Sequence, residues 1–206
     1  IKDFDGKVIA ITGSNGKTST TSIVADSLRK VSTTIENFNN EIGLPISIMS
    51  AKKDSRYIVL EAGAAKKGDI EYLSKLVKPD IGIITNIGYS HLEKLLNLEG
   101  VFKVKSELIK NIRKGGTLIV PNDLRYLERW KKMAKGIKVL PVPNKYIATK
   151  EKFSGDGRIM TFDIIEKPAG NKKSVVIPIS SSLIGKHNVQ NILAVSYTHL
   201  RAHETS

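Results

Sequence analysis

The segment Lys7–Ser19, KVIAITGSNGKTS, decides the fold and carries the most specific functional signal of the chain. It opens with an apolar run, Val8–Ile11, which is typical of a strand buried on both faces of a parallel sheet. The run breaks at the turn Gly13–Gly16. An apolar pattern at helical spacing follows, made of Ile23, Val24, Leu28 and Val31. A strand, a glycine turn and a helix in this order direct backbone N–H groups and the positive end of the helix at a bound phosphate.

The residue types in this turn favour a nucleotide site. Gly13 and Gly16 let the backbone close around an anion. Lys17 can reach the outer phosphates, and the Thr18 hydroxyl is a ligand for Mg²⁺. The usual phosphate loop, G-x-x-x-x-G-K-[ST], has a glycine six residues before the lysine, but Ile11 stands there in this chain, followed by Thr12. The shorter loop argues against most kinases and GTPases, and an ordinary strand–helix turn is the alternative.

Length and composition favour one α/β domain, alone or with a small appendage, since the chain has 206 residues of which 40% are hydrophobic. The absence of cysteine excludes disulfides and thiolate chemistry and favours a reducing, cytoplasmic compartment. No apolar run approaches the roughly 18 residues of a membrane span, and the start has no signal pattern, so we expect neither insertion nor secretion. Because the chain begins with Ile close to a core strand, we expect a fragment of a longer protein. We also expect the protein to be a monomer.

The net charge of +13 allows two interpretations. Nucleic-acid binding is one of them. However, the lysines are spread along the chain, only 6% of residues are aromatic, and no basic motif interleaved with aromatics occurs. A lysine-rich solvated surface, or attraction of a polyanionic nucleotide, is therefore favoured, and no nucleic-acid partner is expected.

Polar residues follow two further predicted strands where each strand ends. Glu61 follows the strand 57–60, and His91 lies just beyond the strand 81–86. The carboxyl ends of parallel strands meet at one edge of a sheet, where α/β proteins bind ligands. Glu61 is therefore a candidate Mg²⁺ ligand facing Thr18. A solvated glutamate and a structural histidine are the alternatives.

A lysine occupies an unusual position in the helix expected at about residues 99–114. The apolar face of this helix consists of Val101, Val104, Leu108 and Ile112. Lys105 falls in the middle of that face, and a lysine among apolar neighbours loses hydration, which disfavours its charged form. A neutral amine reacts with CO₂ to give a carbamate, whose negative charge suits Mg²⁺. On periodicity alone, a lysine that extends to the surface is the simpler interpretation.

The remaining pattern predicts an α/β fold, with a mostly parallel sheet, helices on both faces and a small antiparallel β appendage. Further strands are expected at 33–36, 117–120 and 138–142, and further helices near 46–49, at 70–77 and up to about 134. The segments 158–166 and 174–179 have strand composition with no helix between them, so they form the expected appendage. Another helix begins within 185–194. The amide-rich loop 37–45 suits ligand hydrogen bonds but is also typical of a turn.

The last segment, residues 195–206 (VSYTHLRAHETS), abandons the apolar period where the preceding helix would continue. It resembles one reading frame of a sequencing-library adapter, so we exclude this non-native tail and expect a single domain at 1–194. His199 and His203 imitate a helical metal pair, but they lack the glutamate of H-E-x-x-H and are assigned no function.

Six segments, taken in order, form a set far more specific than any one of them. They are T-G-S-N-G-K-T at 12–18, N-F-N-N-E-I-G-L-P at 37–45, L-E-A-G at 60–63, N-I-G-Y-S-H-L-E at 86–93, K-S-E-L at 105–108 and G-K-H-N-V-Q-N-I-L-A at 185–194. Together they resemble the Mur ligase family. The resemblance covers residues 5–194 and implies the family's central ATP-binding domain, without the N-terminal UDP-binding and the C-terminal domains of its members.

The resemblance also implies roles for individual residues. The implied ATP-binding residues are Gly13, Ser14, Asn15, Gly16, Lys17, Thr18 and Ser19 at the phosphates, with Asn188 and Asn191 near the base. The implied Mg²⁺ ligands are Thr18, Glu61, His91 and Lys105 as a carbamate. The implied catalytic residues are Lys17, His91 and Lys105, and the residues implied near the substrate are Asn39 and Asn40.

The implied reaction is ATP-driven amide formation through an acyl phosphate. The loop 37–45 is most similar to members that add D-alanyl-D-alanine to a UDP-linked muramoyl tripeptide, in peptidoglycan synthesis. Other Mur-type ligases and folylpolyglutamate synthase are the nearest alternatives, and a nucleotide-gated binding module is the alternative of another class. Because the flanking domains are missing, we expect weak nucleotide binding and no ligation by residues 1–206 alone.

Overall fold

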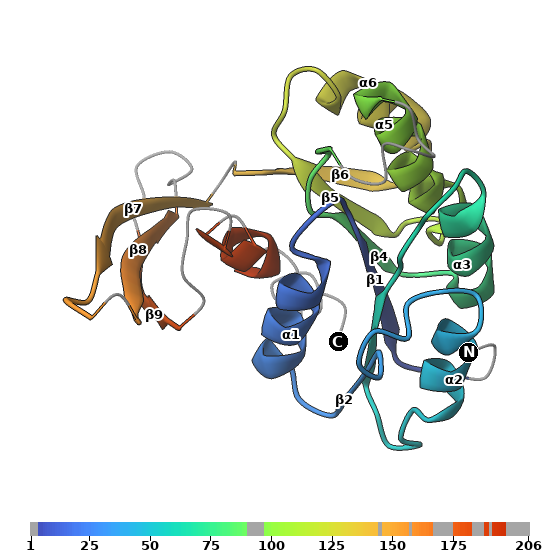
Figure 1. Ribbon diagram of the computed structural model, residues 1–206, viewed down its shortest axis with the longest axis horizontal. Helices are drawn as coiled ribbons and strands as arrows, with labels where there is room; N and C mark the ends of the chain where they lie inside the picture. The colour runs from blue at the N-terminus through green and yellow to red at the C-terminus, as the bar shows by residue number, and fades with distance from the viewer. Residues whose placement is uncertain are drawn as a thin grey trace.

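The central sheet of the computed structural model has six parallel strands in the order β2-β3-β1-β4-β5-β6 (Figure 1). These strands are β1 (Lys7–Thr12), β2 (Val31–Thr33), β3 (Tyr57–Glu61), β4 (Ile81–Ile84), β5 (Thr117–Pro121) and β6 (Lys138–Val142). The structure describes residues 4–89, 97–143, 146–156, 158–166, 175–182, 188–189 and 191–196. The predicted fold class is confirmed.

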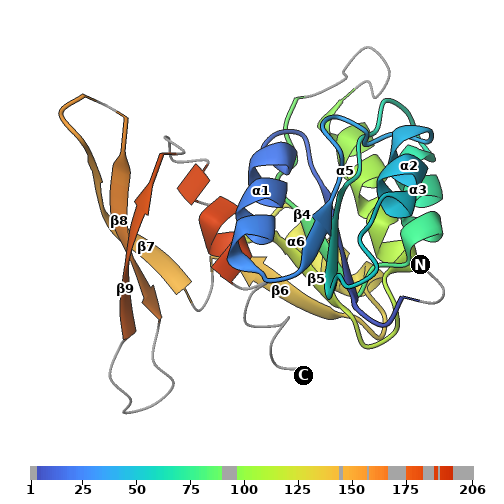
Figure 2. The ribbon, with the colours of Figure 1, turned by 90° about the horizontal axis from the view of Figure 1, so that it is seen from below.

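Helices cover both faces of this sheet (Figure 2). They are α1 (Lys17–Ser27), α2 (Gly43–Met49), α3 (Asp69–Val77), α5 (Leu98–Ser106) and α6 (Leu127–Met133), with a 3-10 helix, η1 (Glu107–Asn111), continuing α5. Residues 188–189 and 191–196 are also helical, and they share one face with α1. The helices α2, α3, α5 and α6 lie on the other face.

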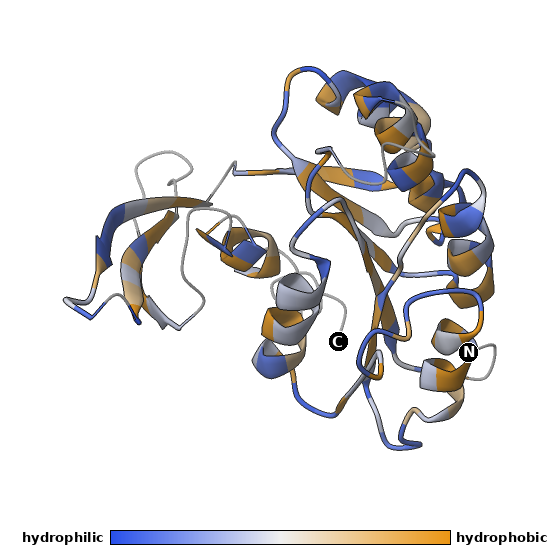
Figure 3. Cartoon of the chain, viewed as in Figure 1, coloured by the Kyte–Doolittle hydropathy of each residue, from blue (hydrophilic) through white to orange (hydrophobic). Residues whose placement is uncertain are grey.

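Strand β1 lies at the centre of both hydrophobic layers. Val8 and Ala10 belong to the cluster under α3 and α5, whereas Ile9 and Ile11 belong to the cluster under α1. This alternation follows from the period of two along a strand, and it explains why β1 is apolar at every position. Figure 3 shows that hydrophobic residues gather on the central strands of the sheet.

The antiparallel appendage has three strands, of which the sequence predicted two. They are β7 (Tyr146–Phe153), β8 (Met160–Glu166) and β9 (Val175–Ser181), in the order β7-β8-β9. Met160, Phe162 and Ile164 of β8 pack in the same cluster as Ile192 and Leu193. Strand β7 escaped prediction because it is an edge strand with several charged residues, which obscure the strand pattern.

Two predicted boundaries are wrong. The helix expected at 99–114 ends as a 3-10 helix at Asn111, because Arg113 N–H already donates to Pro79 O in the turn toward β5. The strand expected at 33–36 is β2, Val31–Thr33, so Val31 belongs to the sheet and not to α1. Lys30, with φ +56°, separates the two elements.

The described part of the chain has no helix that is both long and apolar enough to cross a membrane. Val195 and Ser196, the first two residues of the predicted tail, continue the preceding helix, and Val195 is buried. Residues 197–206 lie outside the described residues, so the origin of the tail stays a prediction.

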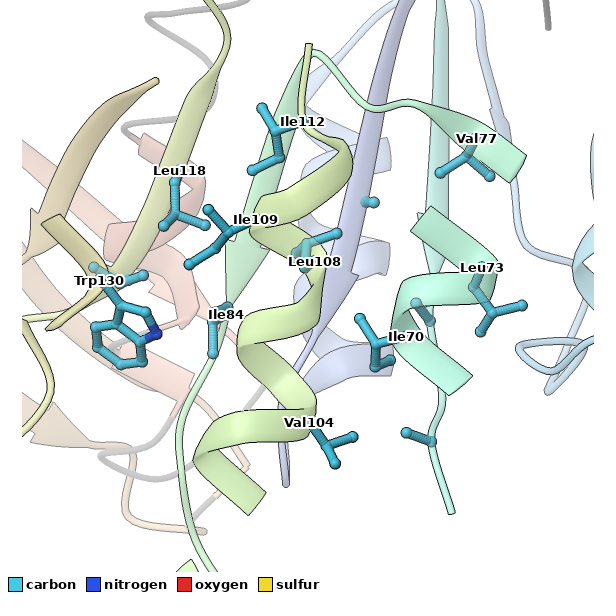
Figure 4. Packing of buried hydrophobic residues seen from close by; sticks show 14 of the residues in the cluster. Ile70, Leu73, Val77, Ile84, Val104, Leu108, Ile109, Ile112, Leu118 and Trp130 are labelled. Atoms are coloured by element: carbon cyan, nitrogen blue, oxygen red, sulfur yellow. The ribbon is translucent and has the colours of Figure 1, made fainter. Parts of the chain in front are cut away.

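The segment α5–η1 packs directly on the backbone of β4. Figure 4 shows Leu108 of this segment and Ile112, the residue that follows it, in the cluster that also contains Ile84. Gly82 permits the close approach, because a Cβ atom there would lie 2.6 Å from Ile112 Cδ1 and 3.1 Å from Leu108 Cδ2.

Gly82→Val is expected to lower the free energy of unfolding by roughly 1–3 kcal/mol, because the added carbons enter a filled layer. Urea denaturation followed by circular dichroism measures this change. Gly155→Ala is the control, since a Cβ atom at Gly155 meets nothing within 4 Å. Unchanged stability of Gly82→Val would contradict the close packing.

Candidate active site

Two glycines shape the loop between β1 and α1. Gly13 has φ +149° and Gly16 has φ +76°, conformations that L-residues with side chains rarely adopt. A Cβ atom at Gly13 would also collide with Thr85 Oγ1. Gly16 is the N-cap of α1, and because glycine has no side chain, no side-chain oxygen caps the first N–H groups of the helix. An uncapped helix N-terminus therefore faces the carboxyl edge of the sheet, where an anion is favoured.

Side chains from three segments meet beside this loop. Thr18 Oγ1 donates a hydrogen bond to Glu61 Oε2 at 2.8 Å. Asn39 Nδ2 donates to the other oxygen of the same carboxylate, also at 2.8 Å. Lys17 Nζ donates to Gly13 O at 3.2 Å, so this side chain folds back over the loop. Thr18 and Glu61, which the sequence places at one sheet edge, are thus in direct contact.

Lys105 is buried in α5, with 1% of its surface exposed. The pKa of its ammonium group falls from 10.5 to about 8, chiefly because burial disfavours the charged form and then because Lys17 is a nearby positive charge. The carboxylates of Asp69, Glu107 and Glu61 act in the opposite direction. Lys105 therefore lies close enough to Lys17 and Glu61 for the charges of both to shift its pKa.

Two hollows flank the loop. The larger one has a volume of about 670 Å³ and is lined by Lys17, Asn39, Asn40 and the segment 63–66, among others. The smaller one, of about 350 Å³, lies against Gly16 and the ends of β4 and β5.

Asn191 lines the smaller hollow and lies close to the loop. A Cβ atom on Gly16 would be 2.9 Å from Asn191 Nδ2. The same amide group donates to Asn188 Oδ1 at 3.1 Å, and both asparagines are buried. The pair therefore forms a polar wall beside the loop.

Two carboxylates for which no role was predicted bind the backbone of the segment 65–71, part of which lines the larger hollow. Asp69 Oδ2 accepts hydrogen bonds from the N–H groups of Ala65 and Lys66, both at 2.9 Å. The buried Glu107 accepts from the N–H groups of Gly68 and Glu71. The partners of Glu107 lie 36 and 39 residues away, so no local pattern could reveal them.

A family model described as the Mur ligase middle domain matches residues 11–198. The chain belongs to the Mur ligase family. The UDP-N-acetylmuramoyl-tripeptide--D-alanyl-D-alanine ligase of Buchnera aphidicola (subsp. Acyrthosiphon pisum) is 36% identical over 201 residues, which make up 95% of this chain and 43% of that protein.

Solved structures show the same family. A crystal structure of MurF from Acinetobacter baumannii matches with a TM-score of 0.83 and 31% identity, over 94% of this chain and 42% of that one. MurF ligase from Thermotoga maritima in complex with ADP matches with a TM-score of 0.83 and 25% identity, over 97% of this chain and 46% of that one. This Mur ligase chain therefore spans less than half the length of these relatives.

The Mur ligase chain brings most of the predicted site residues together around the start of α1. Asn40 lines the larger hollow, and its Oδ1 accepts from the N–H groups of Ile42 and Gly43, so it shapes the start of α2; its place near the substrate stays a prediction. His91 lies outside the described residues, and its role stays a prediction.

The lowered pKa of Lys105 predicts a pH dependence of stability. Between pH 8 and 10.5 the unfolded chain binds more protons at this residue than the folded one, so the free energy of unfolding rises with pH across this window, by at most about 3 kcal/mol. Urea denaturation in CO₂-free buffer measures the rise, which Lys105→Met is expected to abolish. Lys103→Met, at an exposed position of the same helix, is expected to retain it. Parallel pH profiles for the unaltered chain and Lys105→Met would refute the burial of the amine.

Proposed function

We propose that this chain is the ATP-binding part of a ligase that adds D-alanyl-D-alanine to a UDP-N-acetylmuramoyl-tripeptide in peptidoglycan precursor synthesis. Relatives with this name support the choice of substrates. The proposal depends on one observation: Thr18, Glu61 and Lys105 converge beside an uncapped helix N-terminus. The proposal includes flanking UDP-binding and C-terminal domains, a monomeric cytoplasmic protein, and a non-native tail after residue 194.

The loop suits the phosphates of ATP. In the segment Gly13–Ser19, the backbone N–H groups of Gly16–Ser19 point out of a helix N-terminus, and Lys17 supplies a positive charge beside them. We place the base in the smaller hollow, where Asn191 offers hydrogen bonds beside Gly16 and Asn188 accepts from the amide of Asn191.

Mg²⁺ fits the oxygen atoms at this site. An octahedral Mg²⁺ with ligands at about 2.0–2.1 Å separates adjacent ligand oxygens by about 2.9 Å. Thr18 Oγ1 and Glu61 Oε2 are 2.8 Å apart, so they fit adjacent positions on one ion. The described residues include no group of three His, Cys, Asp or Glu side chains that could hold a metal, so phosphate oxygens, His91 and a modified Lys105 would supply the remaining ligands. Bound Mg²⁺ neutralises the charge of the triphosphate.

The proposed modification of Lys105 is carbamylation. The lone pair of the neutral Nζ attacks the carbon of CO₂, an N–C bond forms while one C=O π bond breaks and leaves its electron pair on the oxygen, and a proton leaves Nζ to solvent. With a pKa of about 8, roughly one tenth of the amine is neutral at pH 7, far more than for an ordinary lysine. Burial therefore supplies the reactive form of the amine.

The chain's part in the reaction is positioning and charge neutralisation. The carboxylate of the UDP-linked peptide attacks the γ-phosphorus of ATP, which releases ADP and gives an acyl phosphate; the amine of D-alanyl-D-alanine then displaces phosphate. Lys17 offsets the repulsion between the anionic carboxylate and the triphosphate. Asn39 and Asn40 line the larger hollow, where we place the reacting end of the peptide.

Lys105 distinguishes the ligase from a nucleotide-gated binding module. A binding module needs Lys17 and Thr18 but has no use for a buried lysine near Glu61. The burial of Lys105 therefore favours the ligase.

In the longer protein that carries this chain, Lys105→Ala is expected to reduce ligation of D-alanyl-D-alanine by 100-fold or more, roughly the loss of one strong electrostatic contact in the transition state. Phosphate release in the presence of both substrates measures the rate. Short-chain carboxylates are expected to restore part of the activity, because they replace the negative charge of the carbamate. Lys103→Ala is the matched control, and equal rates for both variants would refute the proposed role.

Glu61→Gln is expected to lower the ratio of the ADP affinity in Mg²⁺ to that in EDTA about tenfold. The reason is that an amide is a poorer Mg²⁺ ligand than a carboxylate of similar shape. Calorimetric titration of the chain with ADP, with Mg²⁺ and with EDTA, measures this dependence. Glu128→Gln, on an exposed part of α6, is the control. An unchanged ratio of the two affinities would show that Glu61 does not contact the ion.

A further inference from the structure

The backbone N–H groups of the loop between β1 and α1 fall into two sets. Those of Ser14 and Asn15 donate to Asn86 Oδ1, at 3.1 and 2.9 Å, and the Ser14 N–H also lies 3.2 Å from the backbone oxygen of Asn86. Those of Gly16–Ser19 have no acceptor within the described part of the chain, and the first helical bond is from Thr20 N–H to Gly16 O. The loop therefore offers an anion four consecutive N–H groups, and an internal acceptor occupies the two before them.

Further contacts hold the loop against the segment that follows β4. Thr85 Oγ1 donates to Asn15 O at 2.6 Å, and Thr85 N–H donates to Thr12 O at 2.9 Å. Ser14 Oγ lies 2.9 Å from Gly88 O and 3.0 Å from Gly88 N, as donor to the first and acceptor from the second. The conformation of the loop is thus imposed by residues 85–88.

We propose that Asn86 is a positioning residue for phosphate binding. Its side-chain oxygen accepts hydrogen bonds from the N–H groups of Ser14 and Asn15, and the N–H groups of Gly16–Ser19 stay available to the phosphate. The inference rests on the proposed nucleotide site and adds to it a residue that contacts no phosphate. A neutral carbonyl fits this role, because it fixes the loop without placing a negative charge beside the triphosphate. A loop fixed before binding loses less conformational freedom when the nucleotide arrives.

The test compares Asn86→Leu, which keeps the approximate size but removes the acceptor, with the unaltered chain. Calorimetric titration with ADP and with adenosine, both in Mg²⁺, is expected to show a roughly tenfold weaker affinity for ADP and an unchanged affinity for adenosine. Asn111→Leu is the matched control, since the Asn111 side chain also makes two hydrogen bonds, to Glu71 and Ser74, away from the loop. Thermal unfolding of both variants measures any general loss of stability.

Three results would overturn the role of Asn86. Unchanged ADP affinity in Asn86→Leu would mean that the loop needs no such support. Tighter ADP binding would mean that Asn86 occupies N–H groups that the phosphate itself uses. Equal losses for ADP and adenosine, or equal losses in Asn86→Leu and Asn111→Leu, would mean a merely structural contribution.

Amide hydrogen exchange by NMR tests the same inference without nucleotide. The amide of Asn15 is expected to exchange slowly in the unaltered chain and fast in Asn86→Leu, because its acceptor is the Asn86 side chain, whereas the amide of Ser14 also has the backbone oxygen of Asn86 as an acceptor. The amides of Gly16–Ser19 are expected to become protected only when Mg²⁺ and ADP are added. If the unaltered chain binds no ADP, the proposed function fails, while the exchange at Asn15 still decides whether the Asn86 side chain holds the loop. Fast exchange at Asn15 in the unaltered chain, or equally slow exchange in Asn86→Leu, would overturn the inference.

Discussion

The parallel register between β1 and β3 is the constraint on which the site depends. Ile11 pairs with Glu61, and the pairing continues beyond both strands, because Ala62 N–H donates to Ile11 O and Thr12 Oγ1 donates to Ala62 O. A slip of one residue would turn the Glu61 carboxylate to the opposite face of the sheet. The contact between Glu61 and the first turn of α1 is therefore a consequence of how two central strands align.

Lys105 couples the stability of the protein to its proposed chemistry. The buried ammonium group disfavours folding at neutral pH, but Val101, Phe102 and Val104 of the same helix are each no more than 2% exposed, and each such side chain contributes roughly 1.5–3 kcal/mol. The helix therefore tolerates the lysine. A carbamate would reverse the local electrostatics, because Asp69, Glu107 and Glu61 would then repel the modified side chain. Carbamylation and the binding of a cation are thus expected to favour each other.

The sequence reveals those parts of the site that local patterns determine. The meeting of Thr18 and Glu61 follows from the edge at which parallel strands end. Periodicity also places Lys105 on an apolar helical face, but it favours a lysine that extends to the surface, and the packing of other elements around the side chain is what buries it. The bond from Asn39 to Glu61 and the acceptor role of Asn86 could not be predicted, because they depend on how loops far apart in the chain approach each other. Strand β7 was missed for a related reason, since an edge strand obtains its structure from its partner more than from its own pattern.

The junction of α5 and η1 explains why three consecutive side chains, Lys105, Ser106 and Glu107, are all buried polar groups with different partners. Lys105 experiences the charges of Lys17 and Glu61, Ser106 Oγ accepts from Trp130 Nε1 of α6 at 2.9 Å, and Glu107 accepts from the N–H groups before and within the first turn of α3. Successive residues point about 100° apart on an α-helix and about 120° apart on a 3-10 helix, so three in a row reach three directions. One short segment therefore ties the proposed reactive amine to α6 on one side and to the wall of the larger hollow on the other. A displacement of this segment would move the amine and that wall together, which makes the positions of the two interdependent.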